Sequence, residues 1–272
     1  MVRPSEATVE VVLERFDDQL RGVWHGPLPS GVEVERDGPL FCVSGIQGGG
    51  FVEYRDLGGL DGADLDELIS RCVHRFAERG LPFEWKTYGH DAPPDLPERL
   101  VAAGLAPEEP ETVLIAEAAA VAGEVRLPAE VALREVTSGA DLQRVEAFGE
   151  LIGPDAANWL ADMLEAELAA DPDSLTVVVA EANGEIVCRC WVRFATGTDF
   201  ATFWGGSTLP EWRSRGIYRA TVAYRANLAV TRGFRYLQVD ASEETRPILE
   251  RLGFVAVTTT TPYVWTPDGP PV

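Results

Sequence analysis

The sequence predicts an α+β protein of two similar domains, each with a mixed, mostly antiparallel sheet flanked by helices. Three observations support this fold class. The chain has 272 residues, about twice a common domain size. In its second half, segments with apolar residues at helical spacing alternate with β-branched runs. The end of the first half repeats the order helix, strand, helix and strand.

The second domain is expected over residues 131–272. Its predicted elements are two helices, three strands, a helix, a strand, a helix and a final two-stranded hairpin: 141–151, 156–170, 176–180, 186–194, 200–208, 216–231, 236–239, 243–252, and 254–257 with 261–265. Asn183-Gly184 between two β-branched runs is typical of a tight hairpin turn. Gly205-Gly206 inside a strand predicts a bulge or the close approach of another group.

The first domain is expected over residues 1–124. Its last elements are predicted to be a helix at 64–78, a strand at 83–88, a helix at 95–103 and a strand at 112–115. An alanine-rich segment at 117–130 follows, and we place the domain boundary there.

An internal repeat relates the two halves. When Asp91 is aligned with Asp240, Leu100 falls on Leu249 and Gly104 on Gly253 without a gap. Glycine just after a helix is a common helix stop. We infer that the two halves arose by duplication.

Charge and cysteine content exclude several functions. The chain has 44 acidic and 23 basic residues, a formal net charge of −21, which disfavours nucleic acid or an anionic membrane as partner. Cys42, Cys72, Cys188 and Cys190 show no metal-binding spacing, so we expect no metal and a reduced, cytoplasmic protein. No apolar run is long enough for a signal peptide or a membrane span. The oligomeric state, monomer or homodimer, stays open.

One segment reverses the acidic charge. Residues 211–235 contain six arginines and a single acid, Glu211: Arg213, Arg215, Arg219, Arg225, Arg232 and Arg235. Arg213-Ser214-Arg215-Gly216 lies between a strand end and the first turn of a helix, where free N–H groups and the helix dipole favour an anion. Glycine lets the backbone approach a phosphate closely, and guanidinium groups pair with its oxygens. The segment therefore predicts a pyrophosphate site, with Arg225 and Arg232 on the solvated face of the helix.

The residues of this segment resemble the first signature of the GNAT superfamily of N-acetyltransferases, Arg/Gln-x-x-Gly-x-Gly/Ala. Thr208-Leu209-Pro210 stands where the family has the strand end that pairs with pantetheine, and the stretch from Ser242 to Gly253-Phe254 is similar to the second signature. The resemblance implies acetyl-CoA as acyl donor and transfer of its acetyl group to a small-molecule amine. It implies cofactor contacts from Thr208, Leu209, Arg213, Ser214, Arg215, Gly216, Ile217, Tyr218 and Ser242. Residues 1 to about 120 then look like a degenerate copy of the same fold.

Three positions depart from the family pattern. Tyr218 replaces a small residue, Ser242 stands where many members have asparagine, and Leu249 stands where many carry the tyrosine that protonates the departing thiolate. A thiol of pKa near 8.5 leaves without a dedicated acid. The missing tyrosine keeps a second hypothesis open, a non-enzymatic acyl-CoA sensor or interaction module.

The general base is sought among carboxylates near the strand ends. Asp240, at the end of a predicted strand, is the first candidate, and the alternative is that it caps the following helix. Glu150 and Asp199 are further candidates, with a solvated surface position as the alternative. Among the histidines, His74 is expected in the core and His90 in a loop that could line an interdomain cleft.

The first half is not expected to bind the anion. At the matching strand-to-helix junction it has four acidic residues that would repel phosphate: Asp56, Asp61, Asp64 and Asp66. We expect this half to be structural or to form one wall of the substrate cleft. An acidic surround favours a cationic amine as acceptor.

Overall fold

The computed structural model describes residues 6–46, 49–153, 158–267 and 269. Its helices are α1 Glu6–Leu20, α2 Gly62–Arg79, α3 Leu96–Ala102, α4 Ala118–Val121, α5 Gly139–Glu150, α6 Leu160–Ala170, α7 Ile217–Thr231 and α8 Arg246–Arg251, with a 3-10 turn at Pro210–Trp212. Its strands are β1 Glu33–Asp37, β2 Leu40–Ile46, β3 Gly49–Glu53, β4 Phe83–Tyr88, β5 Ala106–Pro107, β6 Glu111–Glu117, β7 Val131–Val136, β8 Leu175–Ala182, β9 Glu185–Phe194, β10 Phe200–Thr208, β11 Tyr236–Ala241 and β12 Val255–Trp265. In these ranges no helix is long and apolar enough to cross a membrane.

All strands join one mixed sheet. Its order is β1-β2-β3-β4-β12-β6-β11-β10-β9-β8-β7, with β5 beside β12. Two neighbouring pairs are parallel, β3 with β4 and β10 with β11, and the other pairs in the described residues are antiparallel. The expected mixed, mostly antiparallel α+β architecture is confirmed. Each parallel pair is connected through a helix, as parallel strands require.

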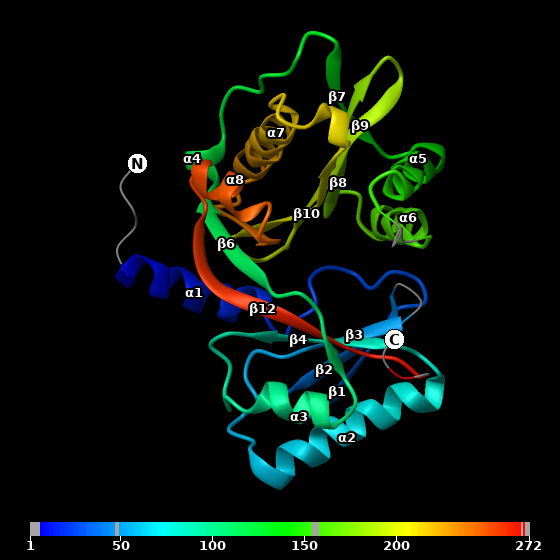
Figure 1. Cartoon of the computed structure of the whole chain (residues 1–272), viewed down its shortest axis with the longest axis vertical. Coiled ribbons are helices and arrows are strands. Elements are labelled where there is room, and N and C mark those ends of the chain that lie inside the picture. Colours follow the sequence, from blue (N-terminus) through cyan, green and yellow to red (C-terminus); the bar gives the residue numbers. More distant parts are fainter. Residues whose placement is uncertain (1–5, 47–48, 154–157, 268, 270–272) are drawn as a thin grey trace.

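The two halves exchange strands at their junction. The first-half strand β6 pairs with β11, while the C-terminal strand β12 pairs with β6 and then with β4. Figure 1 shows β12, in red, running from the upper lobe into the lower one. The predicted hairpin of 254–257 with 261–265 is therefore wrong, because β12 is one continuous strand. Its two ends have different partner strands, so no turn is needed.

Helices cover both faces of the sheet in the second half. In Figure 1, α7 and α8 lie on one face and α5 and α6 on the other. The α7/α8 layer buries residues such as Val222 and Leu249 against β9, β10 and β11, and the α5/α6 layer packs on β8 and β9. In the first half, α2 and α3 pack on β2, β3 and β4. Helix α1 bridges the halves, since Phe16 packs against β6, β10 and β11.

The local signals of the second half are confirmed. Asn183 and Gly184 form the turn between β8 and β9, both at positive φ. Strands β4 and β10 have the predicted bounds, while the start of the helix expected at 156–170 lies partly outside the described residues.

The sequence pattern did not predict α1, β1–β3 or β7. The edge strand β1 is polar and mostly exposed, so its sequence lacks the apolar alternation that identifies a strand.

The internal repeat is confirmed at the ends of α3 and α8. The N–H of Leu105 donates to Leu100 O, and that of Phe254 donates to Leu249 O, both at 3.1 Å. The glycine between them, Gly104 or Gly253, has positive φ in each case. The ungapped alignment fails at its other end, because Asp91 follows β4 by three residues whereas Asp240 lies within β11.

Candidate functional site

The parallel strands β10 and β11 separate near their carboxyl ends. They pair only from Phe200 to Thr202, and beyond this point β10 bulges away from β9 between Trp204 and Ser207. The predicted bulge at Gly205-Gly206 is thus confirmed. Gly205 has a φ of +60°, and a Cβ there would overlap the ring of Trp191. Only glycine fits this position, which shapes the opening between the strands.

A narrow cavity of about 290 Å³ fills the opening between β10 and β11. Helix α7 contributes Tyr218 and Arg225 to its wall, and the first half contributes Lys86 and Glu111. A Cβ on Gly206 would lie 2.9 Å from Cε2 of Tyr218, so this ring rests directly on the strand backbone. Both halves of the chain therefore line one cavity.

The start of α7 presents free backbone donors beside this cavity. Ser214 and Gly216 have φ of +61° and +81°, and residues 214–216 are exposed. The N–H of Arg213 donates to Pro210 O, and that of Ala220 donates to Gly216 O. The N–H groups of residues 214–219, which lie between these two donors, have no hydrogen-bond acceptor in the described part of the chain. Such a run of donors at a helix N-terminus suits a phosphate or pyrophosphate.

Contacts with neighbouring residues fix the two arginines that precede α7 close to the start of this helix. Nε of Arg213 donates to Thr208 O at 3.2 Å, which ties the loop to the end of β10. Arg215 pairs with Glu130, and its guanidinium carbon lies 4.3 Å from the ring centroid of Trp212. Both side chains are therefore positioned by their neighbours beside the free backbone donors.

Two other arginines of the segment differ in their exposure to solvent. Arg232 is exposed as expected, but the prediction that Arg225 lies on the solvated face is wrong, because it is 1% exposed. Ile217, Thr221 and Arg225 follow each other at intervals of four on α7 and are all buried. This interval puts the Arg225 side chain on the face that packs against the sheet.

The other expected cofactor contacts lie at the end of β10, at the start of α7 and after β11, and they differ in the groups that they offer. Thr208 is buried and donates to Cys188 Sγ at 3.3 Å, and the N–H of Leu209 is occupied by Val187 O at 3.0 Å. Ile217 is buried in a core cluster, which leaves its N–H as the group it can offer. Ser242 lines the cavity at the end of β11.

A wide cleft of about 1040 Å³ lies between the two halves and joins the narrow cavity. Six residues line both spaces and so mark their junction: Lys86, Glu111, Trp204, Gln238, Asp240 and Ser242. Carboxyl groups dominate the wall of the cleft: Glu53, Glu84, Glu108, Glu109, Glu111, Glu167, Asp171, Asp240, Glu243 and Glu244. The arginine and lysine side chains of this wall are Arg193 and Lys86, and Arg193 is paired with Glu167 at 2.8 Å.

Burial changes the proton affinity of three of these carboxyl groups. Burial raises the pKa of Glu53 to about 7, against a smaller opposing effect of Lys86. It also raises the pKa of Glu84 and of Glu111 above the ordinary value. Carboxyl groups with raised pKa are suited to accept a proton near neutral pH.

The first candidate base, Asp240, is engaged in an ion pair. Its Oδ2 lies 2.7 Å from Lys86 Nζ, and its Oδ1 accepts from Gln238 Nε2 at 2.7 Å. The capping alternative is wrong, because α8 starts at Arg246 with Thr245 as its N-cap. Burial by itself lowers the pKa of Lys86, but the negative charges of Asp240 and Glu84 outweigh this effect. The pKa of Lys86 therefore lies well above its ordinary value, and the ammonium stays charged. Lys86 was not among the predicted site residues, and the signal that could have found it is that it is the only lysine in the chain.

The remaining candidates lie outside the junction. Asp199 accepts from Arg15 at 2.9 Å and from Gln19 at 3.1 Å, which joins α1 to the start of β10. Glu150 is exposed at the end of α5. The expectation that His74 lies in the core is wrong, because it is exposed on α2 and pairs with Glu78 at 3.1 Å.

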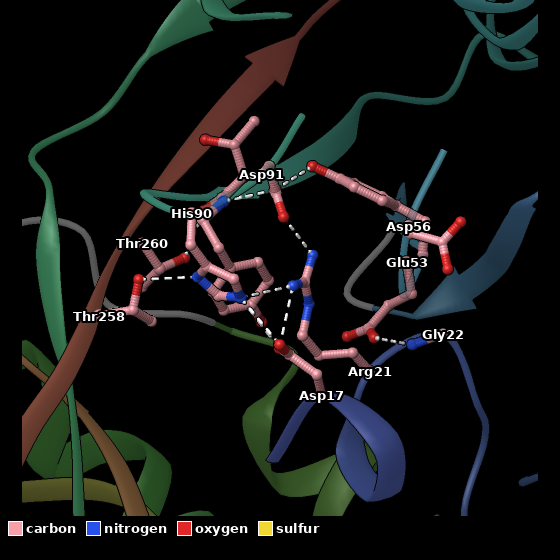
Figure 2. Close-up of polar contacts among 12 residues, drawn as sticks. Asp17, Arg21, Gly22, Glu53, Asp56, His90, Asp91, Thr258 and Thr260 are labelled. Carbon is pink, nitrogen blue, oxygen red and sulfur yellow. Dashed lines mark hydrogen bonds and ion pairs between the residues drawn. The ribbon is translucent and has the colours of Figure 1, made fainter. Parts of the chain in front are cut away.

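The equivalent opening in the first half is closed by its own side chains (Figure 2). Arg21, at 2% exposure, lies 2.7 Å from Asp91 and 3.0 Å from Asp17, and its guanidinium carbon is 4.0 Å from the ring centroid of Tyr88. His90 joins this group, 2.9 Å from Asp17 and 2.9 Å from Thr258 of β12. Asp17 and Asp91 therefore neutralise the only arginine drawn in this opening, Arg21.

The acidic residues expected at this junction are present. Asp56 and Asp61 line a hollow of about 610 Å³ together with Asp17 and Asp91, while Asp64 and Asp66 lie on α2. Arg21, Arg55 and His90 line the same hollow, so side chains of both charges surround it.

Comparison with solved structures identifies the fold. A GCN5-related N-acetyltransferase from Kribbella flavida is similar with a TM-score of 0.67 and 17% identity over 97% of this chain and 95% of that one. A tandem GNAT protein from the clavulanic acid biosynthesis pathway is similar with a TM-score of 0.62 and 14% identity, covering 100% of this chain and 98% of that one. A functionally unknown conserved protein from Staphylococcus epidermidis has a TM-score of 0.64 and 14% identity over 88% and 95% of the two chains.

No family model matches the sequence, and no curated protein matches it. At sequence identities of 14–17%, structural similarity identifies the fold alone. The chain has the tandem GNAT fold, as its signatures predicted.

Proposed function

We propose that this chain is an acetyl-CoA-dependent N-acetyltransferase whose second half, residues 131–272, binds the acyl donor and whose first half, residues 1–124, completes the acceptor site. One observation carries the proposal: free N–H groups of residues 214–219 stand beside a narrow cavity that opens into an acidic cleft. The free N–H groups suit the pyrophosphate of the donor. The narrow cavity between β10 and β11 suits the end of its pantetheine arm, with the thioester inside the cavity next to the junction.

The acceptor we propose is a cationic small-molecule amine. The cleft wall carries ten carboxyl groups against Lys86 and Arg193, both of which are already paired with carboxylates. Such a wall concentrates cations and repels anionic acceptors. Trp24 and Phe51 line the same wall, with their ring centroids 6.4 Å apart, and offer an apolar surface to the uncharged part of the acceptor.

Direct attack in a ternary complex needs a neutral amine at the thioester carbon. Glu111 lines both spaces, and its raised pKa suits it to take the proton that the amine loses. We assign this role to Glu111 in preference to Asp240, because the Asp240 carboxylate is already paired with Lys86. The amine nitrogen bonds to the carbonyl carbon, the C–S bond breaks, and coenzyme A leaves.

Thiol release and coenzyme A binding test the proposal. We expect acceptor-dependent release of free thiol from acetyl-CoA with polyamines or aminoglycosides, and little with neutral amines. Arg213→Ala with Arg215→Ala should weaken coenzyme A binding by about tenfold or more, since each removes a charged group beside the pyrophosphate. The matched control is Arg246→Ala with Arg251→Ala, two arginines of α8 outside the described cavities.

The outcomes separate the hypotheses. Coenzyme A binding without thiol release for any amine would favour the sensor hypothesis, which the burial of Leu249 at the place of the family tyrosine keeps open. A preference for neutral or anionic amines would contradict the acceptor class. No binding of coenzyme A at all would contradict both the enzyme and the sensor.

A further inference from the structure

Two guanidinium groups are almost completely buried at equivalent places in the two halves. Arg21 lies where β3 and β4 end, at 2% exposure, and Arg225 lies where β10 and β11 separate, at 1% exposure. Their surroundings differ in one respect. Arg21 is neutralised by Asp17 and Asp91, as Figure 2 shows. Within the described residues, no carboxylate pairs with Arg225.

The contacts of Arg225 position it without neutralising it. Nε donates to Thr221 O and Nη1 donates to Trp191 O, both at 3.2 Å. The guanidinium carbon lies 4.1 Å from the ring centroid of Phe203 on β10. Carbonyl oxygens and an aromatic face hold the cation in one orientation, with its positive charge still uncompensated.

The groups that face Arg225 from the packed elements are neutral. Cys188 and Cys190 face it from β9, and burial raises the pKa of both thiols. Tyr218 faces it from α7, and burial raises the pKa of its phenol as well. Asp240 and Glu111 line the same cavity: Asp240 is paired with Lys86, and burial raises the pKa of Glu111.

An uncompensated buried cation is costly, and it is retained in a protein with 44 acidic residues that could have supplied a partner. Arg225 also lines the narrow cavity, so an anion placed there would meet a charge that is almost completely buried. These two facts point to an anion that is present only when a ligand is bound.

We propose that Arg225 is a catalytic residue that stabilises the thiolate sulfur released from the acyl donor, with the Tyr218 hydroxyl as a second donor to the same sulfur. This inference rests on the proposed acetyl transfer. It assigns a use to two departures from the family pattern at once, because Tyr218 enters the cavity from α7 while Leu249 is buried in the core.

The step balances without a further reactant. An ammonium acceptor first loses one proton to water, which leaves the neutral amine. The amine nitrogen forms a bond to the acetyl carbon, and the electron pair of the C–S bond passes to sulfur. The guanidinium of Arg225 and the O–H of Tyr218 stabilise the negative charge on sulfur, and the proton that the neutral amine loses as the amide forms goes to Glu111. Water then returns that proton to the thiolate, so that amide and coenzyme A thiol are the products.

Arg225→Met and Arg225→Lys test the proposal, with Arg251→Met, an exposed arginine of α8, as control. Removing the charge should lower kcat by about 10²-fold with the KM for acetyl-CoA changed by less than about threefold, a loss typical of a charge-stabilising donor. The lysine variant should recover at least a tenth of kcat, and Tyr218→Phe should lower kcat by about tenfold.

Ultraviolet titration of bound coenzyme A gives a readout that a structural role would not change. In the wild type the bound thiol should ionise at a pH at least one unit lower than in Arg225→Met, and its affinity should rise with pH across the range of the thiol. Because the methionine variant removes an unpaired buried charge, it should fold with a Tm no lower than that of the wild type.

The outcomes for Arg225 differ from those for the proposed function. A kcat of Arg225→Met within about threefold of the wild type, or an unchanged ionisation of bound coenzyme A, would overturn this inference alone. A wild type that binds no coenzyme A would remove the proposed function and the inference together. If Arg225→Met does not fold, the lysine and Tyr218→Phe variants decide by the same two measurements.

Discussion

Single residues set the chemistry of the junction between cavity and cleft. Lys86 and Asp240, 154 positions apart in sequence, are 2.7 Å apart and place one charge from each half in the same wall. Glu53, Glu84 and Glu111 surround the pair with carboxyl groups whose pKa is raised by burial. At this scale the site combines a fixed ion pair with carboxyl groups whose pKa is raised by burial.

Glu53 gives a pH-dependent stability that can be measured. Its pKa of about 7 in the folded protein exceeds the ordinary value of 4.5, so the folded state binds more protons between these values. The free energy of unfolding should therefore fall as pH rises from about 4.5 to 7. Glu53→Gln should remove this fall and be more stable than the wild type at pH 8, by up to about 3 kcal/mol.

Urea unfolding at about pH 4, 6 and 8 checks this expectation. The two proteins should be equally stable at the lowest pH, where Glu53 is protonated in the folded and the unfolded state. Glu185→Gln, at an exposed glutamate of β9, serves as control. A Glu53→Gln variant that is less stable than the wild type at the highest pH would contradict it.

At the scale of elements, the bulge in β10 separates this strand from β11. Gly205-Gly206 allows the bulge, and the positive φ of Gly205 together with the ring of Trp191 leaves no room for a side chain. The first half repeats the parallel pair but uses α1 to close it, through Arg21 and its two aspartates. The same local fold is thus open in one copy and closed in the other.

Gly205→Ala should destabilise the protein and close the cavity. A left-handed backbone costs alanine about 1 kcal/mol, and the overlap with Trp191 adds about 1–3 kcal/mol. Gly197→Ala is the matched control, since Gly197 also has positive φ, at +83°, but an added Cβ there would meet nothing within 4 Å. Thermal unfolding with and without coenzyme A should show a larger fall in Tm for Gly205→Ala than for Gly197→Ala, and a lost coenzyme A shift for Gly205→Ala alone. Equal behaviour of the two variants would contradict this.

At the scale of the whole molecule, the exchange of β6 and β12 joins the halves into one sheet. Strand β11 has β6 of the first half as a neighbour, and β12 crosses between the halves to reach β4. The acidic cleft follows from this arrangement, because residues from α1, β3, β4, β10 and α6 meet around it. The cleft that we propose as the acceptor site is therefore formed only by the complete chain.

A fragment experiment tests this dependence. Residues 131–272 alone would leave β11 and β12 without β6, and unpaired strand edges promote aggregation. We expect this fragment to be insoluble or oligomeric, whereas residues 111–272, which keep β6, should be more soluble. Size-exclusion chromatography distinguishes the two. A monomeric, stable 131–272 fragment would contradict the expectation.

The sequence was informative where a signal is local. Asn183-Gly184, the Gly205-Gly206 bulge and the helix ends at Gly104 and Gly253 each depend on backbone conformations that few residues adopt, so their identity reveals the structure. It was misleading where partners are remote. An arginine in a helix is expected to face solvent, and the sequence does not show that Arg225 lies on the face of α7 that packs on the sheet. The two halves of β12 were predicted to pair with each other, because the sequence does not show that their partners are β6 and β4 of the first half.

The sequence by itself predicted the α+β class and the tandem GNAT fold, which the structure confirms, and it supplied the arginine-rich segment before α7 on which the proposed anion site rests, because these depend on neighbouring residues and short spacings. Only the tertiary structure decided the strand exchange, the Lys86–Asp240 pair, the carboxyl groups that share one cleft and the uncompensated charge of Arg225. Charge pairing and burial arise from contacts between residues far apart in the chain, and no local pattern specifies them.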